Sequence, residues 1–170
     1  MNRTRWWIGI LLGTAVLLLA SGAGADESDP LPAAQGTPRE RAVSAYNEGV
    51  KLMRNKYHVA AQEQFEQALA LDEALAEAHN NLAFSLRMQG AHNFERALNH
   101  YNRALELKPD LARASLYRGV LFIHMGDLSR ARADQAKLLG LDQELAAKLE
   151  RIIVGIDGHD EYDELAAQYD

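Results

Sequence analysis

Between residues 42 and 145 the sequence repeats one pattern three times, and this repetition limits the possible folds more than any other feature. Each repeat holds two stretches with apolar residues at helical spacing, separated by a short polar break. The repeats start at Ala42, Ala76 and Ala112, which gives periods of 34 and 36 residues. A helical hairpin that is apolar on both sides cannot bury itself and needs neighbours. The sequence therefore predicts an all-α fold of stacked hairpins.

Small residues recur at fixed places in the repeats. Gly49, Ala83 and Gly119 lie inside the first helix of each repeat, where a small side chain lets two helices approach closely. The second helices carry a small, a larger and another apolar residue at positions i, i+4 and i+7: Ala61, Phe65 and Ala68, then Ala97, Tyr101 and Ala104, then Ala131, Gln135 and Leu138. These side chains are the predicted core.

Helix start and stop signals divide the chain further. Thr37, Pro38 and Glu40 form a capping-box signature, so the first helix should begin at Pro38. Asp110 and Asp127 are expected to cap later helices, and Gly126 is expected to end one. The predicted helices are about 38–54, 57–70, 74–89, 92–107, 111–125, 128–139 and 143–156.

These units resemble tetratricopeptide (TPR) repeats, whose pattern is W-x2-L-G-x2-Y, then A-x3-F, A and P, at a 34-residue period. The matching residues are Gly49, Ala61, Phe65 and Ala68; Leu82, Ala83, Ala97, Tyr101, Ala104 and Pro109; and Gly119, Gly126 and Ala131. No Trp opens a unit, Glu73 and Gln143 replace the closing Pro, and Gln135 replaces the aromatic residue. The resemblance implies a right-handed α-solenoid of three hairpins, 42–75, 76–111 and 112–145, with a concave groove that binds peptides or protein partners.

The segments outside the repeats have separate roles. Residues 1–25 resemble a signal peptide, because Arg3 and Arg5 precede an uncharged Leu-rich stretch and a small-residue site at residues 23–25. An exported, periplasmic protein is expected; the alternative is an uncleaved inner-membrane anchor that faces the periplasm. Residues 26–37, rich in proline, should form a flexible linker.

The C-terminal segments are an expected cap and an acidic tail. In residues 143–156 the apolar side chains share one face, with Lys148 expected to lie away from it, which is typical of a solenoid's capping helix. Residues 157–170 hold six carboxylates and no Lys or Arg. A solvated tail is the expected state of such a segment.

Composition and motifs argue against several classes of function. The net charge of −6 is opposite to that of a nucleic-acid-binding surface, and the chain has no cysteine. The six histidines are not spaced as zinc ligands, and no nucleophile or phosphate-loop motif is present. No cofactor, metal site or enzymatic activity is predicted.

The groove is the expected site of function. In the resembled family its wall is built from first-helix side chains, and the predicted partner-binding residues are Tyr46, Asn47, Val50, Met53, Asn80, Asn81, Phe84, Arg87, Arg113, Tyr117, Val120 and His124. The wider wall adds Val43, Arg54, Glu77, Met88, Leu116 and Ile123. Asn47 and Asn81 are expected to hydrogen-bond a peptide backbone. The alternative is that Val50, Phe84, Met88, Val120 and Ile123 pack between neighbouring helices.

Some relatives hold a partner's C-terminal carboxylate with Lys, Asn and Arg side chains. Asn81 and Arg113 fit that scheme here, whereas Tyr46, Val50 and Tyr117 occupy its other places and do not. The predicted function is an adaptor or assembly factor of the cell envelope that binds a partner peptide or helix. The alternative is a homo-oligomeric scaffold assembled through the capping helix or the acidic tail.

Overall fold

The structure is a computed structural model, and it describes residues 36–155. These residues form seven α-helices and one short 3₁₀ helix, with no strand among them. The α-helices are α1 Pro38–Arg54, α2 His58–Leu71, α3 Ala76–Met88, α4 Phe94–Leu107, α5 Ala112–His124, α6 Leu128–Leu139 and α7 Gln143–Val154; η1 is Ala91–Asn93. The described residues 36–155 belong to one compact unit. Because this unit contains its own hydrophobic core, it has what it needs to fold alone.

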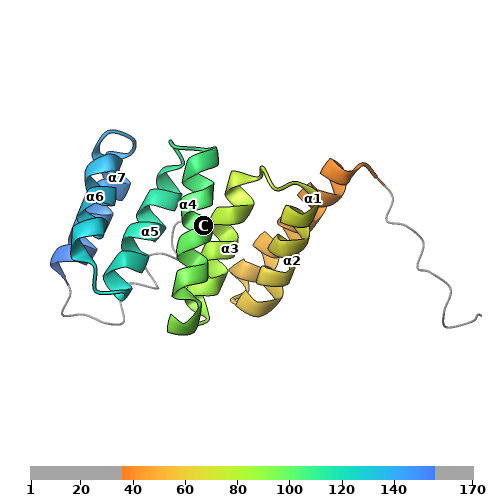
Figure 1. Cartoon of the computed structure of the whole chain (residues 1–170), viewed down its shortest axis with the longest axis horizontal. Coiled ribbons are helices and arrows are strands. Elements are labelled where there is room, and N and C mark those ends of the chain that lie inside the picture. The colour runs from red at the N-terminus through yellow and green to blue at the C-terminus, as the bar shows by residue number, and fades with distance from the viewer. Residues whose placement is uncertain (1–35, 156–170) are drawn as a thin grey trace, which may run out of the picture. The chain divides into compact units, whose positions relative to one another are not determined.

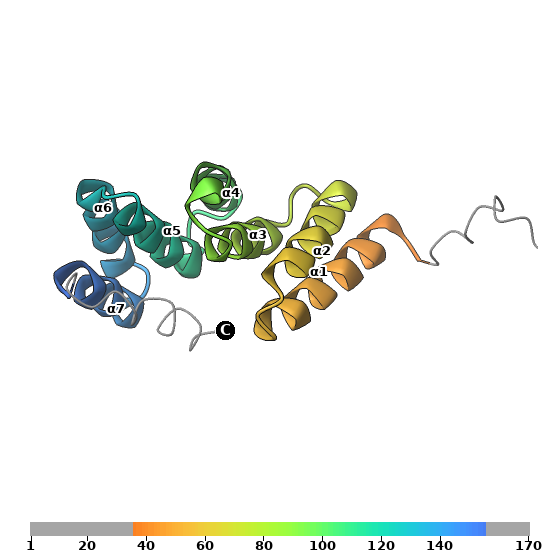
Figure 2. The ribbon, with the colours of Figure 1, turned by 90° about the horizontal axis from the view of Figure 1, so that it is seen from below.

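Three helical hairpins, α1–α2, α3–α4 and α5–α6, lie side by side in chain order (Figure 1). Each second helix also contacts the first helix of the next hairpin. The last helix, α7, packs against both α5 and α6 (Figure 2). The described residues therefore form the predicted α-solenoid of hairpins with a terminal capping helix.

The helices begin and end within two residues of the predicted positions. The capping box is confirmed: the Thr37 hydroxyl accepts from the Glu40 N–H at 3.2 Å, and the Glu40 carboxylate accepts from the Thr37 N–H at 2.7 Å. Asp127 caps α6 as predicted. The prediction for Asp110 is wrong, because α5 starts one residue later, with Leu111 as its N-cap and no side-chain cap.

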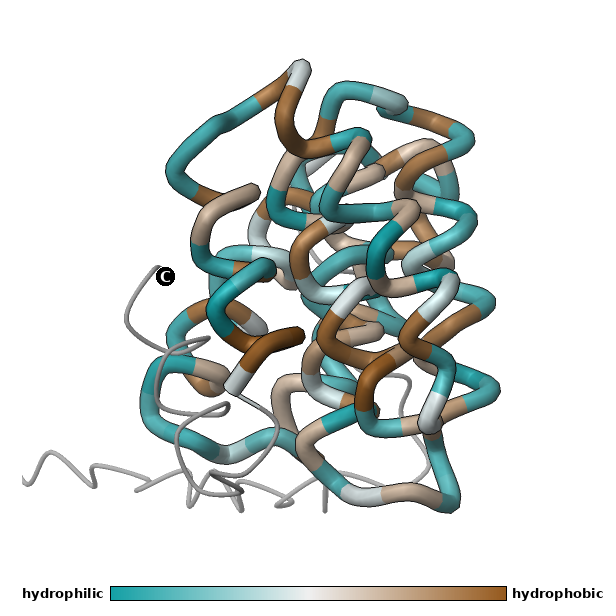
Figure 3. The backbone as a smooth tube through the Cα atoms, turned by 90° about the vertical axis from the view of Figure 1, so that its left-hand side faces the viewer, coloured by the Kyte–Doolittle hydropathy of each residue, from teal (hydrophilic) through white to brown (hydrophobic). Residues whose placement is uncertain are grey.

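The predicted core positions are confirmed in the first two hairpins. Their second helices bury Ala61, Phe65, Ala68, Ala97, Tyr101 and Ala104 completely. Polar and apolar residues alternate at short intervals along the helices (Figure 3), as two-sided packing requires. In the third hairpin Ala131 and Leu138 are buried, but Gln135 is only partly buried and the neighbouring Asp134 is buried instead.

The small residues of the first helices allow close helix contacts. A Cβ atom added to Gly49 would lie 2.6 Å from a ring carbon of Phe65, so α1 and α2 meet at that glycine. A Cβ atom on Gly119 would lie 2.5 Å from a methyl carbon of Leu149, so α7 uses the same position in α5. In two of the hairpins, the glycine at this repeated position therefore lets a neighbouring helix pack closely against the first helix.

The capping helix α7 buries more than its apolar face. Leu145, Leu149, Ile152 and Ile153 are buried as expected. Lys148, expected to lie away from that face, is only 1% exposed, so this expectation is wrong. It falls between Leu145 and Ile152 at helical spacing, and its long aliphatic stem can pack beside them.

No helix within residues 36–155 is long and apolar enough to span a membrane. The predicted signal segment 1–25, nearly all of the linker 26–37 and the acidic tail 157–170 lie outside the described residues. Their assignments stay predictions.

Candidate functional site

A pocket of about 160 Å³ lies between α1, α3 and the start of α5. Six of the predicted partner-binding residues line it: Tyr46, Val50, Met53, Asn80, Asn81 and Arg113. Arg54 and Glu77 of the predicted wall line it too, and so does Leu111, the N-cap of α5, which the sequence did not indicate. We call these nine residues the first-helix pocket. Its volume equals that of about five water molecules, at ~30 Å³ each, or that of one medium-sized side chain.

Three polar side chains form a chain of hydrogen bonds along this pocket. The Asn80 amide donates to the Asn81 carbonyl oxygen at 2.9 Å, and the Asn81 amide donates to the Tyr46 hydroxyl at 3.3 Å. Asn80 is 5% exposed, and its Oδ1 atom has no hydrogen-bond partner within residues 36–155. A buried acceptor of this kind costs free energy until a donor reaches it. A peptide N–H is a suitable donor.

The charges around the pocket favour an anionic ligand. Arg54 and Arg113 line it, and α3 and α5 begin beside it without side-chain caps, so both present partly positive N-termini. The one acidic lining residue, Glu77, accepts from Lys108 Nζ at 2.8 Å. That hydrogen bond lowers the pKa of Glu77 and raises the pKa of Lys108. Lys108 thus offsets the Glu77 charge, and two arginines remain in the lining.

Four other predicted residues lie in the core instead. Phe84, Arg87, Tyr117 and Val120 are each at most 3% exposed. The Phe84 ring lies 5.3 Å from the Tyr117 ring, and the Arg87 guanidinium lies 5.2 Å from the Phe84 centroid. For Phe84 and Val120 this burial favours the alternative of packing between neighbouring helices.

Asn47 and His124, the last two predicted residues, are exposed and do not line the first-helix pocket. The His124 ring instead lies 5.8 Å from Phe94 of α4. The structure therefore gathers half of the predicted set at one pocket. The resemblance to TPR repeats implies that all twelve face the groove from the first helices, but it does not tell how deeply each is buried.

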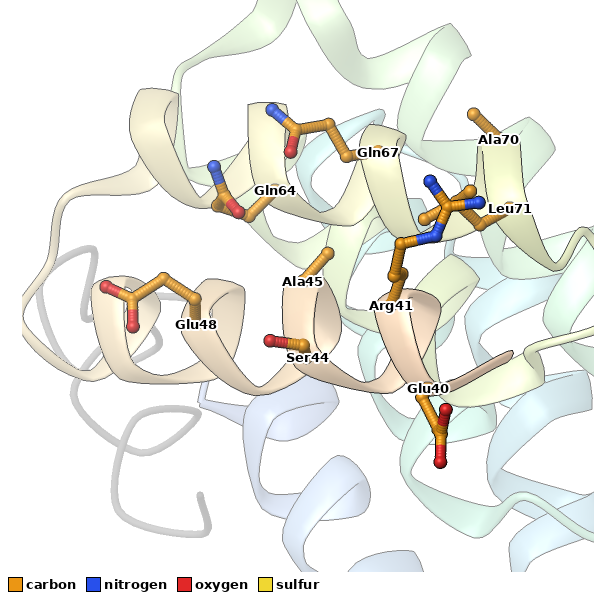
Figure 4. A pocket seen from close by; sticks show the side chains of 9 residues that line it. All are labelled: Glu40, Arg41, Ser44, Ala45, Glu48, Gln64, Gln67, Ala70 and Leu71. Carbon is orange, nitrogen blue, oxygen red and sulfur yellow. The ribbon is translucent and has the colours of Figure 1, made fainter. Parts of the chain in front are cut away.

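A second, larger pocket of about 740 Å³ lies between α1 and α2 (Figure 4). Six of its nine lining residues are polar in type: the lining consists of Glu40, Arg41, Ser44, Ala45, Glu48, Gln64, Gln67, Ala70 and Leu71. A polar outer face is what the terminal repeat of a solenoid needs in order to stay soluble. It brings together no group with an evident chemical role.

The sequence pattern did not indicate a partly buried histidine pair. His79 Nδ1 in α3 lies 3.0 Å from His100 Nδ1 in α4, and His79 Nε2 lies 3.1 Å from the Glu73 carbonyl oxygen. Burial, then the neighbouring His79, lowers the pKa of His100 to about 4; burial also lowers the pKa of His79. No group of three potential metal ligands occurs within residues 36–155.

Comparison with known proteins decides what kind of hairpin stack this is. No family model matches the sequence. Among solved structures, the first TPR of Spaghetti (RPAP3) bound to HSP90 peptide SRMEEVD matches with a TM-score of 0.63 and 18% identity, over 72% of this chain and 98% of that one. The Arabidopsis OM64 TPR domain matches with a TM-score of 0.65 and 20% identity, over 69% and 98%. The fold is TPR-like.

A bacterial protein shows the same TPR-like arrangement. The Yersinia enterocolitica type III secretion chaperone SycD, in complex with a peptide of the translocator YopD, matches with a TM-score of 0.62 and 13% identity. The match covers 69% of this chain and 93% of that one. At these identities the likeness concerns the fold.

Proposed function

We propose that this chain is a non-catalytic protein-interaction module that binds an acidic, partly apolar peptide segment of a partner in the first-helix pocket. The observation that carries this proposal is the lining of that pocket. Arg54 and Arg113 supply positive charge, Asn80 supplies a buried acceptor, and Tyr46 and Val50 supply apolar surface. Such a combination of an apolar wall with a few placed polar groups is typical of ligand sites.

The peptides held by structures of the same fold support this chemistry. The first TPR of RPAP3 holds the HSP90 peptide SRMEEVD, and the second TPR domain of human RPAP3 holds the HSP70 peptide SGPTIEEVD. Both peptides have three carboxylate side chains near one end. A pocket with two arginines and two helix N-termini suits such a segment.

The proposal also includes the cellular location of this module. The signal-like residues 1–25 favour export, so we place the protein in the bacterial periplasm, either free or held by an uncleaved inner-membrane anchor. An adaptor or assembly factor of the cell envelope fits a small module that binds partner segments.

The proposal can be tested by NMR on residues 34–170, with peptide SRMEEVD as the acidic probe peptide and SRMQQVN, in which neutral amides replace the three side-chain carboxylates, as its counterpart. Titration to millimolar peptide should shift the side-chain amide signals of Asn80 and Asn81 and the methyl signals of Val50. The acidic peptide should bind at least about tenfold more tightly than the neutral one, because losing charge-assisted hydrogen bonds costs ~1.5–3 kcal/mol.

Arg113→Glu should weaken binding of the acidic probe peptide at least about tenfold, since it reverses a lining charge. Arg39→Glu is the matched control, because Arg39 is highly exposed in the first turn of α1 and lies outside the pocket. Equal binding of both peptides, or shifts confined to the polar pocket between α1 and α2, would contradict the proposal.

A further inference from the structure

We propose that the acidic tail of this chain, residues 156–170, occupies the first-helix pocket and competes there with partner segments. This inference rests on the proposed function, since it assigns a resident competitor to the same site.

The tail is long enough to reach the pocket. It follows Val154, the last residue of α7, and α7 packs against α5, whose first turn lines the pocket. The 13 residues of α5 span about 20 Å at ~1.5 Å per residue, and adjacent helices are ~8–10 Å apart. The 15 residues from 156 to 170 can extend to about 50 Å at ~3.3 Å each. No rearrangement of the hairpins is needed.

The charges of the tail and of the helical unit are complementary. Residues 36–155 hold 16 Lys and Arg against 15 Asp and Glu, whereas residues 156–170 hold six carboxylates and no Lys or Arg. At the pocket the balance is more positive, with Arg54 and Arg113 in the lining and Glu77 bound by Lys108. A tethered acidic segment is therefore attracted to this surface.

The tail also carries apolar side chains, and the pocket has room for one medium-sized side chain such as that of Leu165. Tyr162, Leu165 and Tyr169 recur at spacings of three and four residues within a segment that also holds the carboxylates of Asp160, Glu161, Asp163, Glu164 and Asp170. Such spacing places apolar side chains on one face when a segment becomes helical. Both properties required of the partner, acidity and an apolar stripe, are thus present in the chain itself.

Tethering makes even weak binding effective. A short linker gives an effective concentration of about 1 mM, so a tail with an intrinsic Kd of ~100 µM would weaken partner binding roughly tenfold. A partner would then have to displace the tail. The pocket would respond only to segments that bind more tightly than this intramolecular ligand.

The absence of cysteine permits a direct test with a single nitroxide label. Ala166→Cys carries the nitroxide on residues 34–170, and NMR records which signals it broadens. The expected result is broadening at the Val50 methyls and the Asn81 side-chain amide, but not at the backbone amide of Glu63, an exposed residue of α2. No broadening at Val50 and Asn81 would overturn the proposal.

Two further samples identify the occupant. The first sample mixes nitroxide-labelled chains without ¹⁵N with ¹⁵N-labelled chains without nitroxide. Broadening at Asn81 in this mixture would mean docking by a second copy and would overturn the intramolecular inference. In the single chain, Asp163→Asn with Glu164→Gln should reduce the broadening. The matched control, Glu63→Gln with Glu95→Gln, changes two exposed carboxylates of α2 and α4 and should leave the broadening intact.

Affinity for the acidic probe peptide separates this inference from the proposed function. The Asp163→Asn/Glu164→Gln chain should bind the peptide about tenfold more tightly than the unaltered chain. Equal affinity without nitroxide broadening would overturn the tail inference and leave the proposed function standing. Broadening at the pocket without peptide binding to either chain would overturn the proposed function alone.

Discussion

At the scale of single residues, Gly49 determines how closely α1 and α2 approach. A methyl group at this position would lie 2.6 Å from the fully buried Phe65 ring, which has no free space to move into. Gly49→Ala should therefore lower the free energy of unfolding by about 1–3 kcal/mol, the usual cost of overpacking. Urea unfolding followed by circular dichroism measures this change.

Gly140→Ala is the matched control for that substitution. A Cβ atom at Gly140 would meet only the Lys137 carbonyl oxygen, at an ordinary 3.7 Å. Its effect on the free energy of unfolding should stay within about 0.5 kcal/mol. Equal losses in the two variants would mean that the contact of Gly49 with Phe65 does not set the hairpin spacing.

Lys56 occupies a backbone conformation that suits glycine. Its φ is +62°, and the positions 34 and 70 residues later are Gly90 and Gly126, with φ of +114° and +77°. Lys56→Gly should raise the free energy of unfolding by about 0.5–1 kcal/mol, because a side chain is strained there. Lys51→Gly, inside α1, should lower it by about 1 kcal/mol. A loss of stability in Lys56→Gly would contradict this account.

At the scale of helices, the side chain of Arg118 connects three helices, α4, α5 and α6. Arg118 of α5 donates to both carboxylate oxygens of Asp134 in α6, at 2.6 and 2.9 Å, and to Asn102 of α4 at 2.8 Å. Asp134 is 2% exposed. Asp134 is thus buried in place of Gln135, to which the repeat pattern assigns the core position.

Asp134→Ala should lower the free energy of unfolding by about 2–4 kcal/mol, because it leaves Arg118 largely buried without its anion. Glu150→Ala removes the exposed partner of Arg132, which lies 3.7 Å away, and should cost less than about 1 kcal/mol. Thermal unfolding of both variants measures the difference. Similar losses would show that the Arg118 pair is no stronger than a surface pair.

The packing of α3 against α4 should depend on pH through the histidine pair. Burial lowers the pKa of both His79 and His100, that of His100 to about 4, whereas an unfolded histidine titrates near 6.5. The unfolded chain therefore binds more protons between about pH 6.5 and 4, so stability is complete above 6.5 and falls as the pH drops through that window. Arg96, Arg103, Glu66 and Glu73 are the charged groups around the pair.

The loss should amount to about 1–2 kcal/mol once the partial exposure of His100 is taken into account. His100→Asn keeps a donor toward His79 and removes the titration, so its unfolding free energy should vary less between pH 6.5 and 4. His92→Asn, at an exposed position in η1, is the control. An unchanged pH dependence in His100→Asn would contradict the assignment.

At the scale of the whole molecule, the repeats made most of the fold predictable. The 34- and 36-residue spacing predicted the stack of three hairpins. The capping box at Thr37 and the glycine stop at Gly126 are local signals, and each gave a correct helix boundary. The prediction that Asp110 caps α5 was wrong, because only the residue directly before the first helical residue can act as the N-cap.

The candidate site was only half predictable, for a physical reason. Periodicity shows which side chains share a face of one helix, but the neighbouring helix decides which of them remain accessible. Phe84 and Tyr117 are buried against each other, whereas Val50 and Asn81 line a pocket. The pairing of His79 with His100 joins residues 21 positions apart on different helices, which spacing alone does not reveal.

The central claim is that the first-helix pocket binds acidic segments through Arg113. A charge-swap cycle tests it most directly: fluorescence anisotropy measures the Kd of SRMEEVD and of SRMKKVD for the unaltered chain and for Arg113→Glu. We predict that Arg113→Glu weakens the acidic peptide and strengthens the basic one, with a coupling free energy of about 1–3 kcal/mol. A coupling of zero, with both peptides changed by the same factor, would contradict the claim.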